Sequence, residues 1–209
     1  MDAARPSGPW SAHAAAGRAV RIVGGRLRGR AFDAPEGQGT RPTGDRVRQA
    51  LFNVLEHAGW SPGLQGRRVM DLFAGSGALG LEALSRGAEV CLFVESDGRA
   101  RGVIGANAAA LGVSAQSRMD RRNATDLGLR PATGASYDLV FLDPPYGKGL
   151  GERALASVEE GGWVEPGAVA VWERGADEPP VTVPGWTPLD ERRYGAARVS
   201  FLRAEEKAW

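Results

Sequence analysis

Cysteine and histidine are nearly absent from this chain of 209 residues, which has one cysteine and two histidines. A lone cysteine cannot form an internal disulfide, and Cys91, in the apolar run CLFV, is expected to be a small buried hydrophobe. His13 and His57 lie far apart in the sequence, so we expect no zinc site and no metal. No apolar run approaches the roughly 18 residues that span a bilayer, and the N-terminus lacks the layout of a signal peptide. These absences favour a cytoplasmic protein without a membrane segment.

Lysine is also scarce, because only Lys148 and Lys207 are lysines among 26 basic residues. The net charge is +1, but residues 1–50 hold nine arginines against four acidic residues. Such a local excess of positive charge favours a polyanionic partner such as a nucleic acid. Since arginine is the usual cation of this chain, a merely solvated basic surface is an equally good interpretation of the charge alone.

The N-terminal part divides into a tail, a hairpin and a helix. Residues 1–17 are expected to be a flexible tail. Residues 18–34 alternate apolar and basic positions around glycines, which predicts a short hairpin with one cationic face. A helix over 43–56 is predicted by an apolar face made of Val47, Leu51, Val54 and Leu55. Thr43 or Asp45 is expected to cap its first turn. We therefore treat 18–60 as an extension that precedes a main domain over 61–209.

From residue 67 onward, apolar strands alternate with helices. Strands are predicted at 67–72, 89–95, 115–119, 138–142 and 168–173, helices at 78–86, 97–111 and 150–160, and a final antiparallel pair of strands within 186–203. Such repeats predict an α/β protein whose mostly parallel sheet is covered by helices on both faces, with an antiparallel hairpin at one edge. In sheets of this kind, ligands bind at the carboxyl ends of the strands.

The first strand of this series runs into the glycine-rich loop DLFAGSGALG. Gly75, Gly77 and Gly80 fit the G-x-G-x-x-G pattern of dinucleotide sites, and Glu95 at the next strand end could accept ribose hydroxyls. Asp71 argues against NAD, because its carboxylate would repel a pyrophosphate on the following helix. The sulfonium and ammonium groups of S-adenosylmethionine would instead be attracted to it. We therefore expect S-adenosylmethionine as the cofactor.

The strand at 138–142 ends in the motif DPPYG. Its two prolines stiffen the turn that presents Asp143 and Tyr146. Asp143 and the carbonyl group of Pro144 could accept the two N–H groups of an exocyclic base amine, and the Tyr146 ring could stack on the base. Asp143 could also take the proton that the amine loses. This pattern indicates methylation of a base amine, for which the base must be flipped or lie in a loop.

Five sequence blocks, in this order, resemble the RsmD-type methyltransferases: RIVGGRLRGR (21–30), RPTGDRVRQALFN (41–53), DLFAGSGALGLEALSRGA (71–88), VESD (94–97) and DPPYG (143–147). The resemblance covers roughly residues 20–203. It implies a Rossmann-like class I methyltransferase fold of seven strands with a small N-terminal extension. It also implies transfer of a methyl group from S-adenosylmethionine to the exocyclic N2 of one guanine in small-subunit ribosomal RNA, in an assembled or nearly assembled 30S particle.

The resemblance and the motifs together give three sets of site residues. The predicted cofactor-binding residues are Asp71, Phe73, Ala74, Gly75, Ser76, Gly77, Glu95, Ser96, Asn123, Ala124 and Asp143. The predicted catalytic residues are Asp143, Pro144, Pro145 and Tyr146. The predicted RNA-binding residues are Arg26, Arg28, Arg30, Arg41, Thr43, Asp45, Arg46, Arg48 and Lys148. No role is assigned to Glu173, and a monomer is expected.

Three other functions stay open at this point. An adenine-N6 methyltransferase acting on DNA or RNA could use the same DPPY motif, although only residues 18–60 are spare for target recognition. An NAD-dependent oxidoreductase would fit the glycine pattern but not Asp71. An RNA-binding module without activity would not need the acid and the aromatic ring of residues 143–146.

Overall fold

A single seven-stranded sheet forms the centre of the protein in a computed structural model that describes residues 20–35 and 44–206. The strand order is β5-β4-β3-β6-β7-β9-β8, where β3 is Arg68–Leu72, β4 Val90–Val94, β5 Ser117–Asp120, β6 Tyr137–Leu142, β7 Val164–Gly175, β8 Trp186–Tyr194 and β9 Ala197–Ala204. Strands β3 to β7 are parallel, and β9 lies antiparallel between β7 and β8. This confirms the predicted mostly parallel sheet with an antiparallel edge hairpin. The strand order changes direction between β3 and β6, where a ligand is expected.

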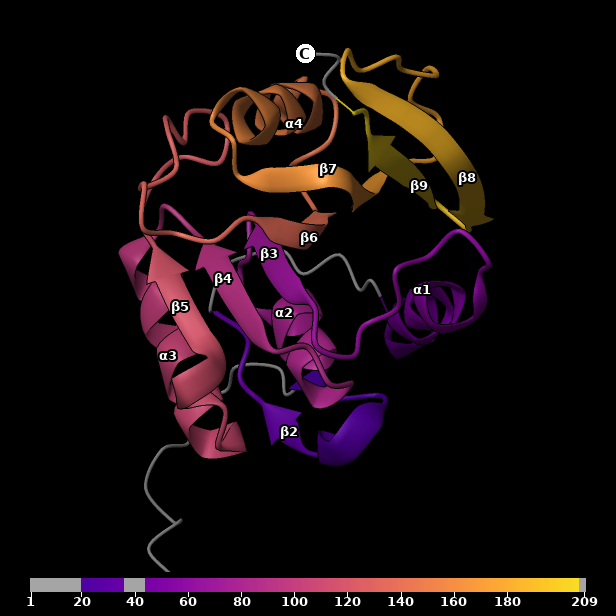
Figure 1. Ribbon diagram of the computed structural model, residues 1–209. Helices are drawn as coiled ribbons and strands as arrows, with labels where there is room; N and C mark the ends of the chain where they lie inside the picture. Colours follow the sequence, from indigo (N-terminus) through magenta and orange to yellow (C-terminus); the bar gives the residue numbers. More distant parts are fainter. Residues whose placement is uncertain (1–19, 36–43, 207–209) are drawn as a thin grey trace, which may run out of the picture.

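Helices cover both faces of the sheet (Figure 1). Helices α1 (Asp45–His57), α2 (Ala78–Ser85) and α3 (Gly98–Leu111) share one buried cluster with the sheet, and α4 (Leu150–Glu160) shares the other. Along β6 the side chains alternate between the two clusters, with Phe141 in the first and Leu142 in the second. None of the helices in the described ranges is long and apolar enough to cross a membrane.

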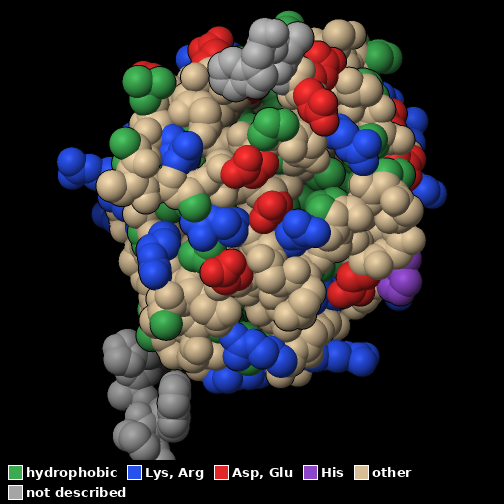
Figure 2. Space-filling view, in the orientation of Figure 1, with side chains coloured by type: hydrophobic (Ala, Val, Ile, Leu, Met, Phe, Trp, Pro, Cys, Tyr) green, Lys and Arg blue, Asp and Glu red, His purple; other side chains and the backbone are tan. Residues whose placement is uncertain are grey.

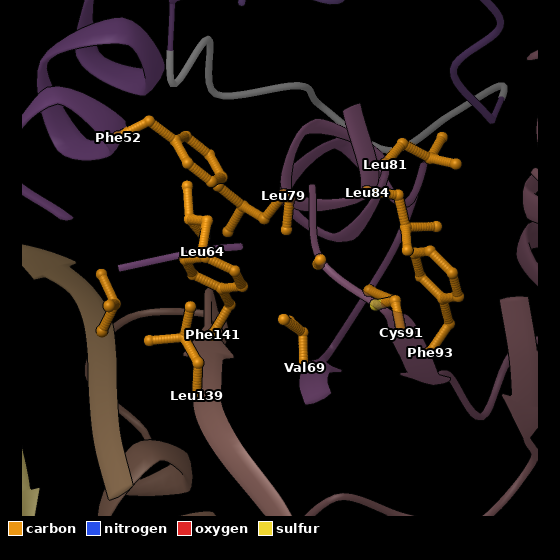
Figure 3. Close-up of a cluster of buried hydrophobic side chains, with 14 of the residues drawn as sticks. Phe52, Leu64, Val69, Leu79, Leu81, Leu84, Cys91, Phe93, Leu139 and Phe141 are labelled. Atoms are coloured by element: carbon orange, nitrogen blue, oxygen red, sulfur yellow. The ribbon is translucent and has the colours of Figure 1, made fainter. Parts of the chain in front are cut away.

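Helix α1 packs on the sheet through Leu51 and Leu55 of its predicted apolar face and through Phe52, which the predicted face did not include. Phe52 is fully buried, and its ring centroid lies 5.4 Å from that of Phe141 on β6. Figure 3 shows both rings in one cluster with Leu79 of α2 and Val69 of β3. Burying a side chain of this size contributes about 2–3 kcal/mol. The extension therefore shares a core with the sheet, and α1 is fixed close to the strand that carries the DPPY turn.

The predicted N-terminal hairpin consists of β1 (Val20–Arg21) paired with β2 (Ala31–Phe32). Two contacts anchor it on α2: the Ser85 hydroxyl group accepts from the Leu27 N–H (3.0 Å), and the Glu82 carboxylate accepts from the Val23 N–H (2.8 Å). Gly25 lies so close to α2 that a Cβ atom on it would stand 2.1 Å from the Ser85 carbonyl oxygen. Glycine at this position thus permits the hairpin to lie against the helix.

Two details of the predicted elements are wrong. Asp45 does not cap α1, because Gly44 occupies the N-cap and the Asp45 carboxylate accepts from Arg48 within the helix instead; Thr43 lies outside the described residues. Strand β7 begins at Val164 rather than at residue 168, since Val164 pairs with Tyr137 of β6 ahead of a register shift and of three exposed residues. Hydropathy alone does not detect such a polar strand end. The predicted tail over 1–17 also lies outside the described residues.

Candidate active site at the carboxyl ends of the parallel strands

The glycine-rich loop makes the connection from β3 to α2 in an unusual backbone conformation. Phe73 (φ 58°), Gly75 (φ 55°) and Gly77 (φ 77°) all adopt left-handed backbone angles, and Gly77 is the N-cap of α2. Phe73 is the only residue other than glycine with a positive φ in the described ranges. Such strain costs about 1–3 kcal/mol and is typical of ligand sites. The loop is thus held tightly where a cofactor would approach its backbone.

Gly80, the third glycine of the motif, leaves room for α2 to pack on the sheet. A Cβ atom on Gly80 would stand 2.3 Å from a ring carbon of Phe93 and 2.5 Å from the Cys91 sulfur. The Gly80 N–H also donates to the Asp71 carboxylate at 2.9 Å. Gly80 therefore permits α2 to pack on β4, and Asp71 fixes α2 to the end of β3.

Asp71, Glu95 and Asp143 bring three carboxyl groups to neighbouring strand ends. Asp71 lies on β3, and Glu95 and Asp143 follow the last residues of β4 and β6, which both pair with Leu72. Asp71 is 2% exposed. The pKa of its carboxyl group is raised to about 8, chiefly by burial and less by the charges of Asp143 and Glu95, against the lowering effect of the Gly80 N–H bond. The site therefore opposes ionisation of Asp71, and a cationic ligand beside these carboxyl groups would favour the ionised form.

Glu95 is held in place by two backbone donors. Its Oε2 accepts from the Gly75 N–H and its Oε1 from the Asp97 N–H, both at 2.9 Å. Each carboxylate oxygen retains a further lone pair for a hydroxyl donor. Asp97 caps α3 by accepting from the N–H groups of Arg99 and Ala100, and these bonds lower the pKa of its carboxyl group. The glycine-rich loop and Glu95, which are both predicted to bind the cofactor, are therefore in direct contact. Ser96, also predicted to bind it, directly follows Glu95.

The loop after β5 holds Asn123 and Ala124 near this edge of the sheet. The Asn123 side chain accepts from the N–H and the hydroxyl group of Thr125, both at 3.0 Å, and so closes a local turn. Ala124 is buried against the second core cluster. Their side chains therefore serve the loop itself, and a cofactor could use only their backbone groups and the remaining donors of Asn123.

The DPPY turn is fixed by the end of β7, its neighbour in the sheet. The Tyr146 hydroxyl group donates to Glu173 Oε1 at 3.1 Å, and the Gly147 N–H donates to Glu178 Oε1 at 3.0 Å. Pro144 is buried and Pro145 is exposed, while Asp143 and Tyr146 are half-buried. Glu173 is not among the predicted site residues. The only signal for it was an acidic residue at the end of an apolar strand.

The predicted RNA-binding arginines separate into two groups in the structure. Arg30 donates to the carbonyl groups of Ala110 and Leu111 at the end of α3, and Arg26 donates to the Gln116 side chain in the 3-10 helix that follows, so both anchor the hairpin to this segment. The prediction for Arg48 is wrong. Its side chain is 4% exposed and bonds to Asp45 (2.9 Å), to the Arg21 carbonyl group and, at 3.8 Å, to the carboxylate of Glu82.

Buried Glu82 explains why Arg48 is turned inward. Its carboxylate also accepts from Arg86 at 2.8 Å, and Arg86 in turn bonds to Glu56 at 2.9 Å. A buried carboxylate requires such partners, and the polar pattern of α1 could not reveal it. Arg41 and Thr43 lie outside the described residues, and Lys148 is exposed beside the DPPY turn.

A cavity of about 480 Å³ lies between the β1–β2 hairpin and α1. Arg21, Arg28 and Arg46 line it with Gln49 and Asn53. All three arginines are exposed, and none of them bonds through its side chain to another residue of the described ranges. Figure 2 shows basic side chains along the lower edge of the molecule, where Figure 1 places the hairpin. Arg21 is an addition to the predicted set. In the described ranges, no group of three or more His, Cys, Asp and Glu side chains is arranged to hold a metal ion.

Comparisons with known proteins agree on one family. The family model described as conserved hypothetical protein 95 matches residues 20–203. Ribosomal RNA small subunit methyltransferase D of Escherichia coli K12 is 37% identical over 194 residues, covering 92% of this chain and 93% of that protein. The protein of the same name from Haemophilus influenzae is 37% identical over 177 residues, covering 84% and 89%. A solved structure, the putative methyltransferase yhhF from Escherichia coli, has a TM-score of 0.75 at 33% identity, covering 90% of this chain and 99% of that one.

Proposed function

This chain belongs to the RsmD family of methyltransferases, and we propose that it methylates small-subunit ribosomal RNA with S-adenosylmethionine, on the exocyclic N2 of a guanine. One observation carries the proposal. The glycine loop with Asp71, the carboxylate of Glu95 and the DPPY turn meet at adjacent strand ends, at the switch point of the sheet. This arrangement supports a methyl-donor site beside an acceptor site.

The residues present fit S-adenosylmethionine, which supplies a methyl group activated by a sulfonium when it is bound. Glu95 would hold the ribose hydroxyl groups through its remaining lone pairs. The backbone of Gly75 and Gly77 permits close approach of the cofactor. Asp71 is buried among carboxyl groups, and a cation beside it would relieve their repulsion. A pyrophosphate there would add to the repulsion, which disfavours NAD.

The DPPY turn would hold the target amine. Asp143 accepts one of its N–H groups and the Pro144 carbonyl oxygen accepts the other, which frees the nitrogen lone pair from the ring. The Tyr146 ring supports the base by stacking, worth about 1–3 kcal/mol. Asp143 then takes the proton that the nitrogen loses. The remaining contribution of the protein is orientation of the reacting groups.

The cavity beside α1 would bind the RNA backbone. Arg21, Arg28 and Arg46 can each donate to phosphate oxygens, since no described side chain engages them. The N-terminus of α1, at Asp45, adds its positive dipole end to the same cavity. We therefore assign the phosphate contacts to these three arginines and to Lys148, and only a folding role to Arg26, Arg30 and Arg48.

The test is transfer of a tritiated methyl group to small ribosomal subunits taken from cells that lack this protein, followed by nucleoside analysis. We expect N2-methylguanosine as the product and no label on naked DNA. Asp143→Ala should abolish transfer while its affinity for S-adenosylhomocysteine stays within about threefold. Labelled N6-methyladenosine would refute the guanine assignment, and an unlabelled particle would refute the proposed function.

A further inference from the structure

The phenol of Tyr146 lies against residues 173–178, the end of β7 and the turn after it. Its hydroxyl group donates to Glu173 Oε1 at 3.1 Å. Its ring lies over Gly175, where a Cβ atom would stand 3.1 Å from ring atom Cδ2. The next residue, Gly147, donates its N–H to Glu178. Glu173 and Gly175 thus contact the phenol itself, and Glu178 fixes the backbone beside it.

Packing does not explain a glutamate at position 173. Glu173 is 4% exposed and pairs across the sheet with Val199; along the strand it follows the buried apolar residues Val171 and Trp172 and precedes the buried Arg174. Burying a carboxylate costs several kcal/mol unless hydrogen bonds satisfy it, so an apolar side chain would suit the core better. Trp172 pairs with Leu142, which brings Glu173 beside Asp143, at the start of the DPPY turn. A costly residue therefore lies at the one place where it reaches the Tyr146 hydroxyl group.

We propose that Glu173 is a positioning residue that fixes the Tyr146 ring at the angle on which the target base stacks. A phenol attached to a loop can rotate about its side-chain bonds, and a base can stack on it only when the ring is presented face-on. The hydrogen bond to Glu173 removes that freedom before RNA binds. The inference rests on the proposed function, because it assigns Tyr146 to the base; the hydrogen bond itself does not depend on it.

The test compares four variants: Tyr146→Phe, Glu173→Leu, Glu173→Gln and the double variant Tyr146→Phe/Glu173→Leu. Small displacements of a reacting group can cost up to about 100-fold, so we expect Glu173→Leu and Tyr146→Phe each to lower kcat/KM for small subunits by about 10- to 100-fold. The double variant should lose no more than either single one, because both remove the same bond. Glu173→Gln keeps an acceptor and should stay within about threefold of the wild type. Affinity for S-adenosylhomocysteine should not change in any of them.

A second readout reports on the ring itself. The chain has only three tyrosines, so ring signals of ¹³C-labelled tyrosine are few, and Tyr146→Phe identifies those of Tyr146 by their loss. In Glu173→Leu we expect these signals to shift and broaden in the absence of RNA, while those of Tyr137 and Tyr194 stay in place. Glu165→Leu, at the other end of β7, is the matched control and should change neither the spectrum nor the activity.

Additive losses in the double variant would overturn the inference, because Glu173 would then act independently of the hydroxyl group. Failure of Glu173→Gln to restore activity would overturn it too, since charge and not a hydrogen bond would be required. Unchanged Tyr146 signals in Glu173→Leu would show that the ring does not depend on the carboxylate. If the wild type labels no ribosomal RNA, the proposed function fails, whereas the ring signals still test the contact.

Discussion

Replacing Asp71 by asparagine should make the protein more stable, and increasingly so as the pH rises from 5 to 8. The carboxyl group is buried, with a pKa raised from 3.8 to about 8. Between these two values the folded protein retains a proton that the unfolded chain has released, so the free energy of unfolding of the wild type falls as pH rises. The asparagine side chain of the variant does not titrate, and its oxygen can still accept the N–H bond of Gly80.

The magnitude follows from the width of this pH window. For each pH unit within this window, the free energy of unfolding of the wild type falls by about 1.4 kcal/mol relative to that of the asparagine variant. Over the three units from pH 5 to pH 8, the advantage of Asp71→Asn should therefore grow by up to about 4 kcal/mol. Water that enters the site when Asp71 ionises would partly solvate its carboxylate, and the advantage of Asp71→Asn would then grow by less. Above pH 8 the difference should level off, because Asp71 is then ionised in both states.

The assay is urea denaturation of both proteins at pH 5, 6, 7 and 8 without ligand. Asp177→Asn, which removes an exposed carboxyl group, is the control. The difference in the free energy of unfolding between variant and wild type removes the contribution of groups that titrate in both proteins. A difference that is constant over this range would refute the reasoning, because Asp71 would then be ionised throughout and the site would not need a cation to relieve it.

Three further outcomes follow from the structure. Arg46→Gln should weaken RNA binding and reduce the slope of log K against log salt by about 0.7–0.9; the control is Arg193→Gln on β8, and an unchanged slope would remove Arg46 from the interface. Gly80→Ala should lower the free energy of unfolding by about 1–3 kcal/mol or more, because the added Cβ atom clashes with β4. The control is Gly102→Ala on α3, where a Cβ atom meets nothing within 4 Å; it should raise the free energy of unfolding by about 0.5–1 kcal/mol. Glu82→Gln should lower the free energy of unfolding by about 3–5 kcal/mol in urea denaturation, since it removes the buried charge that Arg48 and Arg86 share and leaves them only Asp45 and Glu56; a loss below about 1 kcal/mol would contradict this.

The extension shows where sequence patterns stop being informative. The apolar face of α1 predicted the burial of Leu51 and Leu55, but it did not include Phe52, which packs on Phe141. The same helix carries Arg46 and Arg48, two residues of identical chemistry, of which one lines a cavity and the other is buried. Their difference depends on Glu82, which lies much further along the chain, on α2. Charge patterns describe a residue type, whereas exposure depends on what packs against it.

Sequence alone determined the strand–helix alternation, the glycine loop and the DPPY turn, because local backbone preference and hydrophobic period encode such features within a few residues. It also determined that Asp71, Glu95 and Asp143 share one edge, since parallel strands place their carboxyl ends together. Only the tertiary structure decided which arginines stay exposed, that Asp71 is buried deeply enough to hold its proton, and that Glu173 bonds to Tyr146. These properties arise between segments that are distant in the chain, and no local pattern specifies which side chains meet there.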